Sequence, residues 1–103
     1  MTVEKLAILF APNAEKNLED IRDYIEDNGD AKAADSVVEK IFNVCSSLQK
    51  MPKMGKARDE LAPGVRSITS GNYVIYYRIN EQSIDVLRVW HSHRDIAALK
   101  NEL

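Results

Sequence analysis

Apolar positions recur with two different periods in the first half of the chain. Residues 3–10 alternate with a period of two, which predicts a strand over Val3–Phe10 that is covered on at least one face. Ala11-Pro12-Asn13 then breaks the pattern. From Ala14 the apolar residues follow helical spacing, which predicts an amphipathic helix that ends at Asn28-Gly29. Its apolar positions are Ala14, Leu18, Ile21 and Ile25.

A second amphipathic helix follows at once. Asp30 is a suitable N-cap, because its carboxylate can accept a hydrogen bond from a free N–H group of the first helical turn. The helical spacing continues to about Lys50, with an apolar face of Ala34, Val37, Val38, Ile41, Val44, Cys45 and Leu48. Only a short polar break separates the two helices, so we expect them to form an antiparallel hairpin.

The second half of the chain predicts strands. Residues 52–64 are rich in proline, glycine and charge, and we expect an irregular loop there. Three β-type runs follow, at Val65–Thr69, Asn72–Ile79 and Ile84–Trp90. We expect a last helical turn over Ile96–Leu99, with a structural contact from Arg94-Asp95 at its start.

Short turns set the register of the three strands. Ser70-Gly71 can form a two-residue turn with glycine at a positive φ, and residues 80–83 can form the next connection. In that register Arg78 lies opposite Asp85, and Tyr77 lies opposite Val86. The first pair predicts a cross-strand ion pair worth about 0.2 to 1 kcal/mol.

This register also divides the sheet into two faces. One face carries Arg66, Ile68, Tyr73, Ile75, Tyr77, Val86, Arg88 and Trp90, and the other carries Ser67, Val74, Tyr76, Leu87 and Val89. We expect the second face to pack on the hairpin, because it has no arginine in its middle and arginine is costly to bury. The core expected from this choice comprises Leu18, Ile21, Ile25, Ile41, Cys45, Leu48, Val74, Tyr76, Leu87 and Val89.

These elements predict an α+β fold in a single domain over residues 1–103. It has an N-terminal strand, an antiparallel helical hairpin, a three-stranded antiparallel sheet packed on the hairpin and a short C-terminal helical turn. A chain of 103 residues supports one core. No apolar run reaches the roughly 20 residues of a membrane helix, and the N-terminus lacks a signal-peptide pattern, so we expect a cytoplasmic protein with no membrane partner. The single cysteine, Cys45, suits a small buried apolar position.

Charge is unevenly distributed along the chain. Residues 1–49 hold five Lys/Arg and ten Asp/Glu, a net charge of −5, while residues 50–103 hold nine and six, a net charge of +3. The sum is −2, and the pI is about 5.6. This balance argues against a protein that binds nucleic acid with its whole surface, although a local basic patch in the strand-rich half remains open.

Several motifs in this order resemble the RelE/ParE superfamily of bacterial type II toxins, and more closely its ParE branch. The first is the A-x-x-x-L-x-x-I-x-x-Y-I pattern from Ala14 to Ile25, and the second is P-x-x-G-x-x-R-x-E-L from Pro52 to Leu61. They are followed by G-V-R-S, G-x-Y-V-I-Y-Y-R and I-x-V-L-R-V-x-H-x-x-R-D-I. The resemblance spans nearly the whole chain and implies a small fold with a helical hairpin on an antiparallel sheet.

The RelE branch cuts messenger RNA on the ribosome with basic and aromatic side chains, and this chain matches that set only in part. Arg66 and Arg94 fall close to basic positions of the nuclease. Val74 stands where a RelE-like enzyme carries an arginine, and Lys100 stands near its C-terminal tyrosine. If the chain were such an endoribonuclease, the candidate catalytic residues would be Arg66, His91 and Arg94, with His93 close by.

The ParE branch implies a different activity, and we adopt it as the expected function. ParE-like toxins bind DNA gyrase and trap its cleaved DNA complex, so they are not enzymes and need no catalytic set or cofactor. The resemblance implies growth inhibition, a role in plasmid stabilisation, and a cognate antitoxin that links the toxin indirectly to operator DNA. Candidate target-binding residues are Arg58, Arg66 and Arg94, while the antitoxin-binding residues are unknown.

No metal site is expected, because His91 and His93 lack a third ligand nearby. A relative that has lost toxicity and acts in antitoxin complexes is the third alternative.

Overall fold

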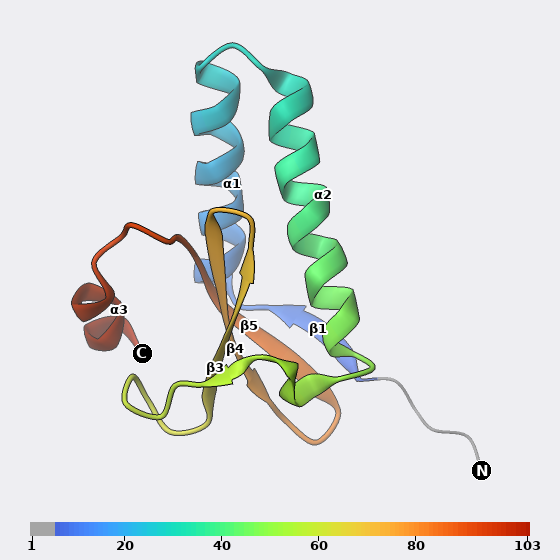
Figure 1. Ribbon diagram of the computed structural model, residues 1–103, viewed down its shortest axis with the longest axis vertical. Coiled ribbons are helices and arrows are strands. Elements are labelled where there is room, and N and C mark those ends of the chain that lie inside the picture. The colour runs from blue at the N-terminus through green and yellow to red at the C-terminus, as the bar shows by residue number, and fades with distance from the viewer. Residues whose placement is uncertain (1–5) are drawn as a thin grey trace.

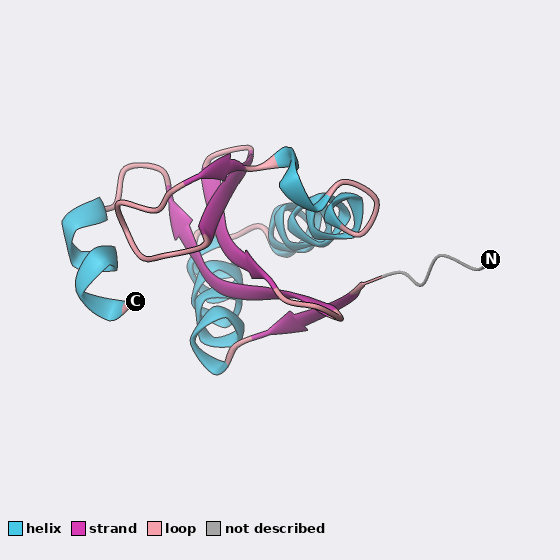
Figure 2. Ribbon diagram, turned by 90° about the horizontal axis from the view of Figure 1, so that it is seen from below, coloured by secondary structure: helices cyan, strands magenta, loops and turns pink. Residues whose placement is uncertain are grey.

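The computed structural model describes residues 6–103, and it contains one mixed sheet with helices on both sides (Figure 1). Five strands lie in the order β1-β5-β4-β3-β2. Helices α1 and α2 form a hairpin on one side, and α3 lies across the strands from α2 (Figure 2). The α+β prediction is therefore confirmed, with two strands beyond the three that the sequence assigned to the sheet.

The helical hairpin forms as the sequence predicts. Helix α1 spans Pro12–Asp27 and α2 spans Ala31–Leu48. The Asp30 carboxylate accepts a 2.9 Å hydrogen bond from the Ala33 N–H, which confirms its role as the N-cap. The expected break at residues 11–13 is instead the start of α1, because proline is tolerated in the first turn of a helix, where its missing N–H group has no partner to lose. Within residues 6–103, no helix is both long and apolar enough to cross a lipid bilayer.

The three predicted strands are present with small shifts at their ends. Strand β3 spans Val65–Ser70, β4 spans Tyr73–Ile79 and β5 spans Ser83–His91. Ser70 pairs with Tyr73, so the two loop residues are Gly71 and Asn72 rather than Ser70 and Gly71. Gly71 has the expected positive φ, at 58°.

Two further strands complete the sheet at its edges. Strand β1 spans Ala7–Phe10 and pairs in parallel with β5, while the expected strand residues 3–5 lie outside the described residues. The expected irregular loop contains a 3-10 helix, η1, at Pro52–Met54 and a two-residue strand, β2, at Lys56–Ala57, which pairs with β3. Helix α3 spans Ile96–Glu102, longer than the predicted single turn.

The predicted assignment of the sheet faces is wrong, and a β-bulge explains part of the error. Tyr76 pairs with Arg88, whereas Tyr77 pairs with Val86, so Leu87 is an extra residue on β5. Alternation therefore shifts at Leu87, and Val86 and Val89 both pack in the cluster formed with the hairpin. Strict alternation would have placed these two residues on opposite faces.

The face that packs on the hairpin is the one with arginines in the predicted register. Its sheet residues are Ile68, Tyr73, Ile75, Tyr77, Ile84, Val86 and Val89. The opposite face packs against α3 and the preceding loops through Leu61, Val65, Tyr76, Trp90 and Leu99, with Val74 and Leu87 at the margin. Val74, Tyr76 and Leu87 therefore belong to a second core, whereas Ile21, Ile41, Cys45, Leu48 and Val89 are buried under the hairpin as predicted.

The predicted ion pair between Arg78 and Asp85 is also wrong, although the two residues do pair across the strands. The Arg78 Nε donates to the Pro63 carbonyl at 3.2 Å. The Asp85 carboxylate accepts from the Ser83 hydroxyl at 2.8 Å and from the Asn80 amide. Arg78 is thus bound to the loop before β3, and Asp85 is bound to the β4–β5 turn and the start of β5.

Cys45 is buried in the hairpin core, as expected. Burial raises the pKa of its thiol to about 11, because the thiolate would lose its hydration there. The thiol is therefore protonated near neutral pH and behaves as an apolar group.

Replacement of Leu48 by alanine should lower the free energy of unfolding by about 2 to 5 kcal/mol, because the side chain is fully buried against Tyr77 and Ile84. Leu9→Ala is the matched control, since Leu9 is 55% exposed on β1 and should cost less than about 1 kcal/mol. Urea denaturation of both variants measures the difference. Equal losses would contradict the packing described above.

Candidate functional site

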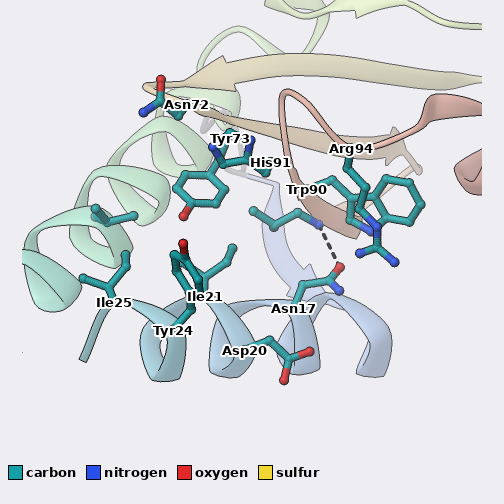
Figure 3. A pocket seen from close by; sticks show the side chains of 12 residues that line it. Asn17, Asp20, Ile21, Tyr24, Ile25, Asn72, Tyr73, Trp90, His91 and Arg94 are labelled. Carbon is teal, nitrogen blue, oxygen red and sulfur yellow. Dashed lines mark hydrogen bonds between the residues drawn. The ribbon is translucent and has the colours of Figure 1, made fainter. Parts of the chain in front are cut away.

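A pocket of about 720 Å³ lies between α1 and the end of the β4–β5 ladder (Figure 3). The hairpin contributes Asn17, Asp20, Ile21, Tyr24, Ile25 and Val37, and the sheet side contributes Asn72, Tyr73, Val89, Trp90, His91 and Arg94. The floor is mostly apolar, and charged groups lie at the rim. The Asn17 amide oxygen accepts a 3.0 Å hydrogen bond from the Val89 N–H, which ties α1 to β5 at this point.

Aromatic side chains form one wall of this pocket. The rings of Tyr73 and His91 meet edge to face with centroids 5.4 Å apart, and His93 stacks on His91 at 5.1 Å. The His93 N–H donates to Nδ1 of His91 at 3.2 Å, so a neutral His91 ring carries its proton on Nε2. Burial raises the pKa of Tyr73, and the nearby Tyr24 adds to this effect.

Arg94 lies over the ring of Trp90, with its guanidinium carbon 3.7 Å from the ring centroid. Within residues 6–103 no carboxylate pairs with Arg94, so this cation–π contact is its main partner. The next residue, Asp95, accepts a 2.9 Å hydrogen bond from the Ala97 N–H and caps α3, which confirms the predicted structural contact. Arg94 is thus held beside the pocket while its guanidinium edge is free of an ion pair.

Four cations gather at the other end of the sheet, along η1, β2 and β3, and we call them the basic edge: Lys53, Lys56, Arg58 and Arg66. Arg66 donates to the carbonyl of Gly55 at 2.7 Å and to that of Lys53 at 3.4 Å. Arg58 donates to Glu60 at 2.6 Å and to the Ser67 hydroxyl at 3.4 Å. The hydrogen bond from Arg58 holds the pKa of the Glu60 carboxyl below its usual range.

The buried Tyr77 hydroxyl holds η1 in place beside this edge. It donates to the Pro52 carbonyl at 2.6 Å and accepts from the Gly55 N–H at 3.0 Å. A Cβ atom at Gly55 would lie 2.5 Å from that hydroxyl and 2.8 Å from the Ser67 carbonyl, so only glycine fits. We refer to these contacts as the Tyr77 clamp, and they explain the glycine at position 55.

The structure separates the residues that the sequence proposed as one catalytic set. His91 and Arg94 line the pocket beside α1, whereas Arg66 lies in the basic edge. Arg66 pairs with Tyr77, and His91 pairs with Tyr73, which comes four residues earlier in β4. Four residues of a strand span about 13 Å. Of the three candidate target-binding residues, Arg58 and Arg66 come together, and Arg94 lies apart.

Residues 6–103 contain no cluster of three histidine, cysteine or acidic side chains that could hold a metal ion. Sequence reasoning also missed what α1 adds to the pocket, namely Asn17, Asp20 and Tyr24. Tyr24 is a large aromatic residue that is 69% exposed on α1. Its exposure follows from the position of α1 on the sheet, which the helical period alone does not give.

Comparison with known protein families matches residues 8–96 to the family model described as "ParE toxin of type II toxin-antitoxin system, parDE". Toxin ParE1 of Mycobacterium tuberculosis is 32% identical over 89 residues, which cover 85% of this chain and 91% of that protein. Toxin ParE3 of Caulobacter vibrioides is 31% identical over 77 residues, which cover 75% and 76%. The matched region includes both the pocket and the basic edge.

Two solved structures share this fold. One is a chain from the chromosomal ParDE TA system of P. aeruginosa, with a TM-score of 0.73, 22% identity and coverage of 84% of this chain and 96% of that one. The other is from the toxin–antitoxin complex RelBE2 of Mycobacterium tuberculosis, with a TM-score of 0.60, 28% identity and coverage of 87% and 94%. The likeness to the first shows the fold alone.

Removal of the Tyr77 hydroxyl should destabilise the protein, because Tyr77→Phe leaves the buried Gly55 N–H and the Pro52 carbonyl without their partner. We expect a loss of about 1 to 3 kcal/mol in urea denaturation. Tyr24→Phe is the control, since the Tyr24 side chain is exposed, and it should change stability by less than about 0.5 kcal/mol. A Tyr77→Phe variant as stable as the control would show that the clamp contributes nothing.

Proposed function

This chain belongs to the ParE toxin family of type II toxin–antitoxin systems, and we propose that it acts by binding DNA gyrase and is neutralised by a cognate antitoxin. Such a toxin stalls its target as a bound inhibitor, so it requires a stable surface rather than a catalytic set. The observation that carries this proposal is the separation of Arg66 from His91 and Arg94. A ribose 2′-hydroxyl attack needs a base, an acid and a cation around one phosphate, and these three side chains do not face one site.

Two substitutions relative to the nuclease pattern support the same conclusion. Val74, at the position where RelE-like enzymes carry an arginine, pairs with Trp90 and packs at the margin of the second core. Lys100, near the position of their C-terminal tyrosine, is exposed on α3. Val74 offers neither charge stabilisation nor proton transfer, and Lys100 does not line the pocket that holds His91 and Arg94.

The cations of the basic edge fit a target that is itself bound to DNA. The cleaved gyrase complex presents phosphate and acidic protein groups, and clustered cations accelerate association with such a surface. Arg58 and Arg66 are held by neighbouring acceptors, so little side-chain freedom is lost on binding. Arg94, beside the pocket that faces α1, provides a second point of contact.

The antitoxin proposal is supported by the structural relatives, both of which come from toxin–antitoxin systems. The pocket beside α1 supports it as well, because an open apolar groove on so small a domain favours a partner segment that folds on binding. In this proposal contact with operator DNA is indirect and passes through the antitoxin, and the target places the toxin in the cytoplasm.

A ribosome-dependent endoribonuclease is the second candidate. It is favoured by the similarity to a chain of the RelBE2 complex and by the presence of His91 and Arg94 in one pocket. A non-toxic relative that acts only in antitoxin complexes is the third candidate. Assays of gyrase supercoiling and of messenger RNA cleavage distinguish both candidates from the gyrase proposal.

Purified toxin should inhibit DNA supercoiling by gyrase, and it should leave ribosome-bound messenger RNA intact. Arg66→Ala should weaken the inhibition about tenfold, since a charge-assisted hydrogen bond is worth roughly 1.5 kcal/mol. Arg22→Ala is the control, because Arg22 is an exposed arginine on α1 that pairs with Asp35. Thermal melting of each variant separates lost binding from lost folding. Codon-positioned cuts in messenger that disappear on His91→Ala would establish the nuclease instead.

Co-expression with the product of the adjacent gene should yield a tight complex of the two proteins, and addition of that product should restore gyrase activity. The physical reason is that the partner covers apolar surface that the toxin leaves open. Size-exclusion chromatography and a supercoiling assay measure the two effects. A toxin that remains monomeric, harmless and without affinity for this product would contradict the proposal.

A further inference from the structure

Two apolar hollows share a pair of exposed methionines at the foot of the helical hairpin. One hollow of about 480 Å³ is lined by Ser46 and Ser47 at the end of α2 and by the residues that follow it, Gln49, Lys50, Met51 and Met54. The other, of about 450 Å³, is lined by Met51, Pro52, Lys53, Met54 and Ile79. Met51 is 61% exposed and Met54 is 44% exposed. We call this surface the methionine foot. Its backbone is the segment that runs from the end of α2 into η1, at the lower end of α2 in Figure 1.

The methionine foot lies in the most basic segment of the chain. Residues 40–58 contain five cations, Lys40, Lys50, Lys53, Lys56 and Arg58, and no aspartate or glutamate. Lys50 lines the first hollow and Lys53 lines the second, so each apolar surface has a cation at its border. A surface of this kind attracts a partner that carries acidic groups beside apolar side chains.

The surface is also rigid enough to bind without a large ordering cost. The Tyr77 clamp fixes Pro52 and Gly55 on either side of Lys53 and Met54. Met54 is further held by its N–H bond to the Met51 carbonyl at 3.0 Å. The backbone of the foot is therefore pre-organised, while the methionine side chains remain adaptable to the shape of an apolar group.

The composition of the foot favours a protein segment over a nucleic acid. Single-stranded nucleic acids bind aromatic side chains that stack on the bases, and no aromatic residue lines either hollow. Duplex DNA offers phosphates, but its exposed backbone has no apolar groups that would fill the two hollows. A short amphipathic segment supplies both, with apolar residues in the hollows and carboxylates toward Lys50 and Lys53.

On this basis, and resting on the proposed function, we propose that the methionine foot docks an acidic amphipathic segment of the cognate antitoxin. The foot adjoins the basic edge directly, because Arg66 donates to the carbonyls of Lys53 and Gly55. An acidic segment bound there masks the cations that we assign to target binding. Docking at the foot therefore gives a physical basis for neutralisation, through charge compensation of the surface that meets the target.

The test compares antitoxin binding by two double variants of the full-length toxin, using the purified product of the adjacent gene as the probe. Met51→Ser with Met54→Ser removes the apolar contacts, and Lys50→Glu with Lys53→Glu reverses the charge. We expect each double variant to weaken the dissociation constant at least tenfold. We also expect the affinity of the lysine variant to depend less on salt than that of the wild type.

Matched controls come from other exposed positions. Leu9→Ser removes an exposed apolar group from β1, and Lys32→Glu reverses an exposed charge near the start of α2. Both should leave the dissociation constant within twofold of the wild-type value. Thermal melting should show all four proteins to be folded.

A photo-crosslinker on an introduced cysteine, Met54→Cys, gives a second measurement. The native Cys45 is buried with its pKa raised to about 11, so the reagent labels the introduced thiol selectively. Mass spectrometry of the crosslinked complex should identify an antitoxin peptide that contains acidic residues. A crosslink only to a neutral or basic peptide would contradict the proposal.

The outcomes distinguish this inference from the function on which it rests. Wild-type toxin that does not bind the antitoxin overturns the proposed function and the inference together. Wild-type binding that both double variants retain overturns the inference alone. The inference also fails if the variants keep the antitoxin but lose gyrase inhibition, DNA binding or self-association, since the foot then serves the target, a nucleic acid or a second copy of the chain.

Discussion

The β-bulge at Leu87 is the constraint on which the rest of this structure depends. Strand β5 is paired on both sides, by β1 and β4, so its side chains decide what each face of the sheet presents. The extra residue lets Val86 and Val89 both pack under the hairpin. Strict alternation from Val86 would direct Arg88 toward the hairpin core, where a guanidinium without partners is costly. With the bulge, Arg88 pairs with Glu102 and donates to the Leu87 and Glu102 carbonyls.

The same bulge positions the pocket beside α1. Beyond it, Val89 reaches the pocket floor, and His91 pairs with Tyr73 at the rim. Trp90 packs in the second core with Leu99 of α3, and Arg94 lies over its ring beside the pocket. The bulge in β5 thus decides which residues enter the second core and which side chains line the pocket beside α1.

Strand β4 links this pocket to the other surface of interest. Tyr73 lies in the wall of the pocket, and Tyr77, four residues along the strand, holds η1 through its hydroxyl. Both surfaces are therefore fixed to one rigid element, although they lie at different ends of it. This arrangement suits the proposed binding of a target and an antitoxin, because both surfaces are supported by the same rigid strand. It suits a nuclease less well, since the cations do not converge on one phosphate.

The sequence alone determined the order and kind of most elements. Helical spacing, the Asp30 cap and the glycine at residue 71 are local signals, and each acts within a few residues of the chain. The basic edge was visible in part, because Arg58 and Arg66 are close in sequence. Tertiary structure alone decided which sheet face meets the hairpin, since one extra residue in β5 changes the side on which every later residue lies. It also decided that Arg78 turns to Pro63, that Tyr77 supports η1 and that Arg66 is separate from His91, because each depends on contacts between residues distant in the chain.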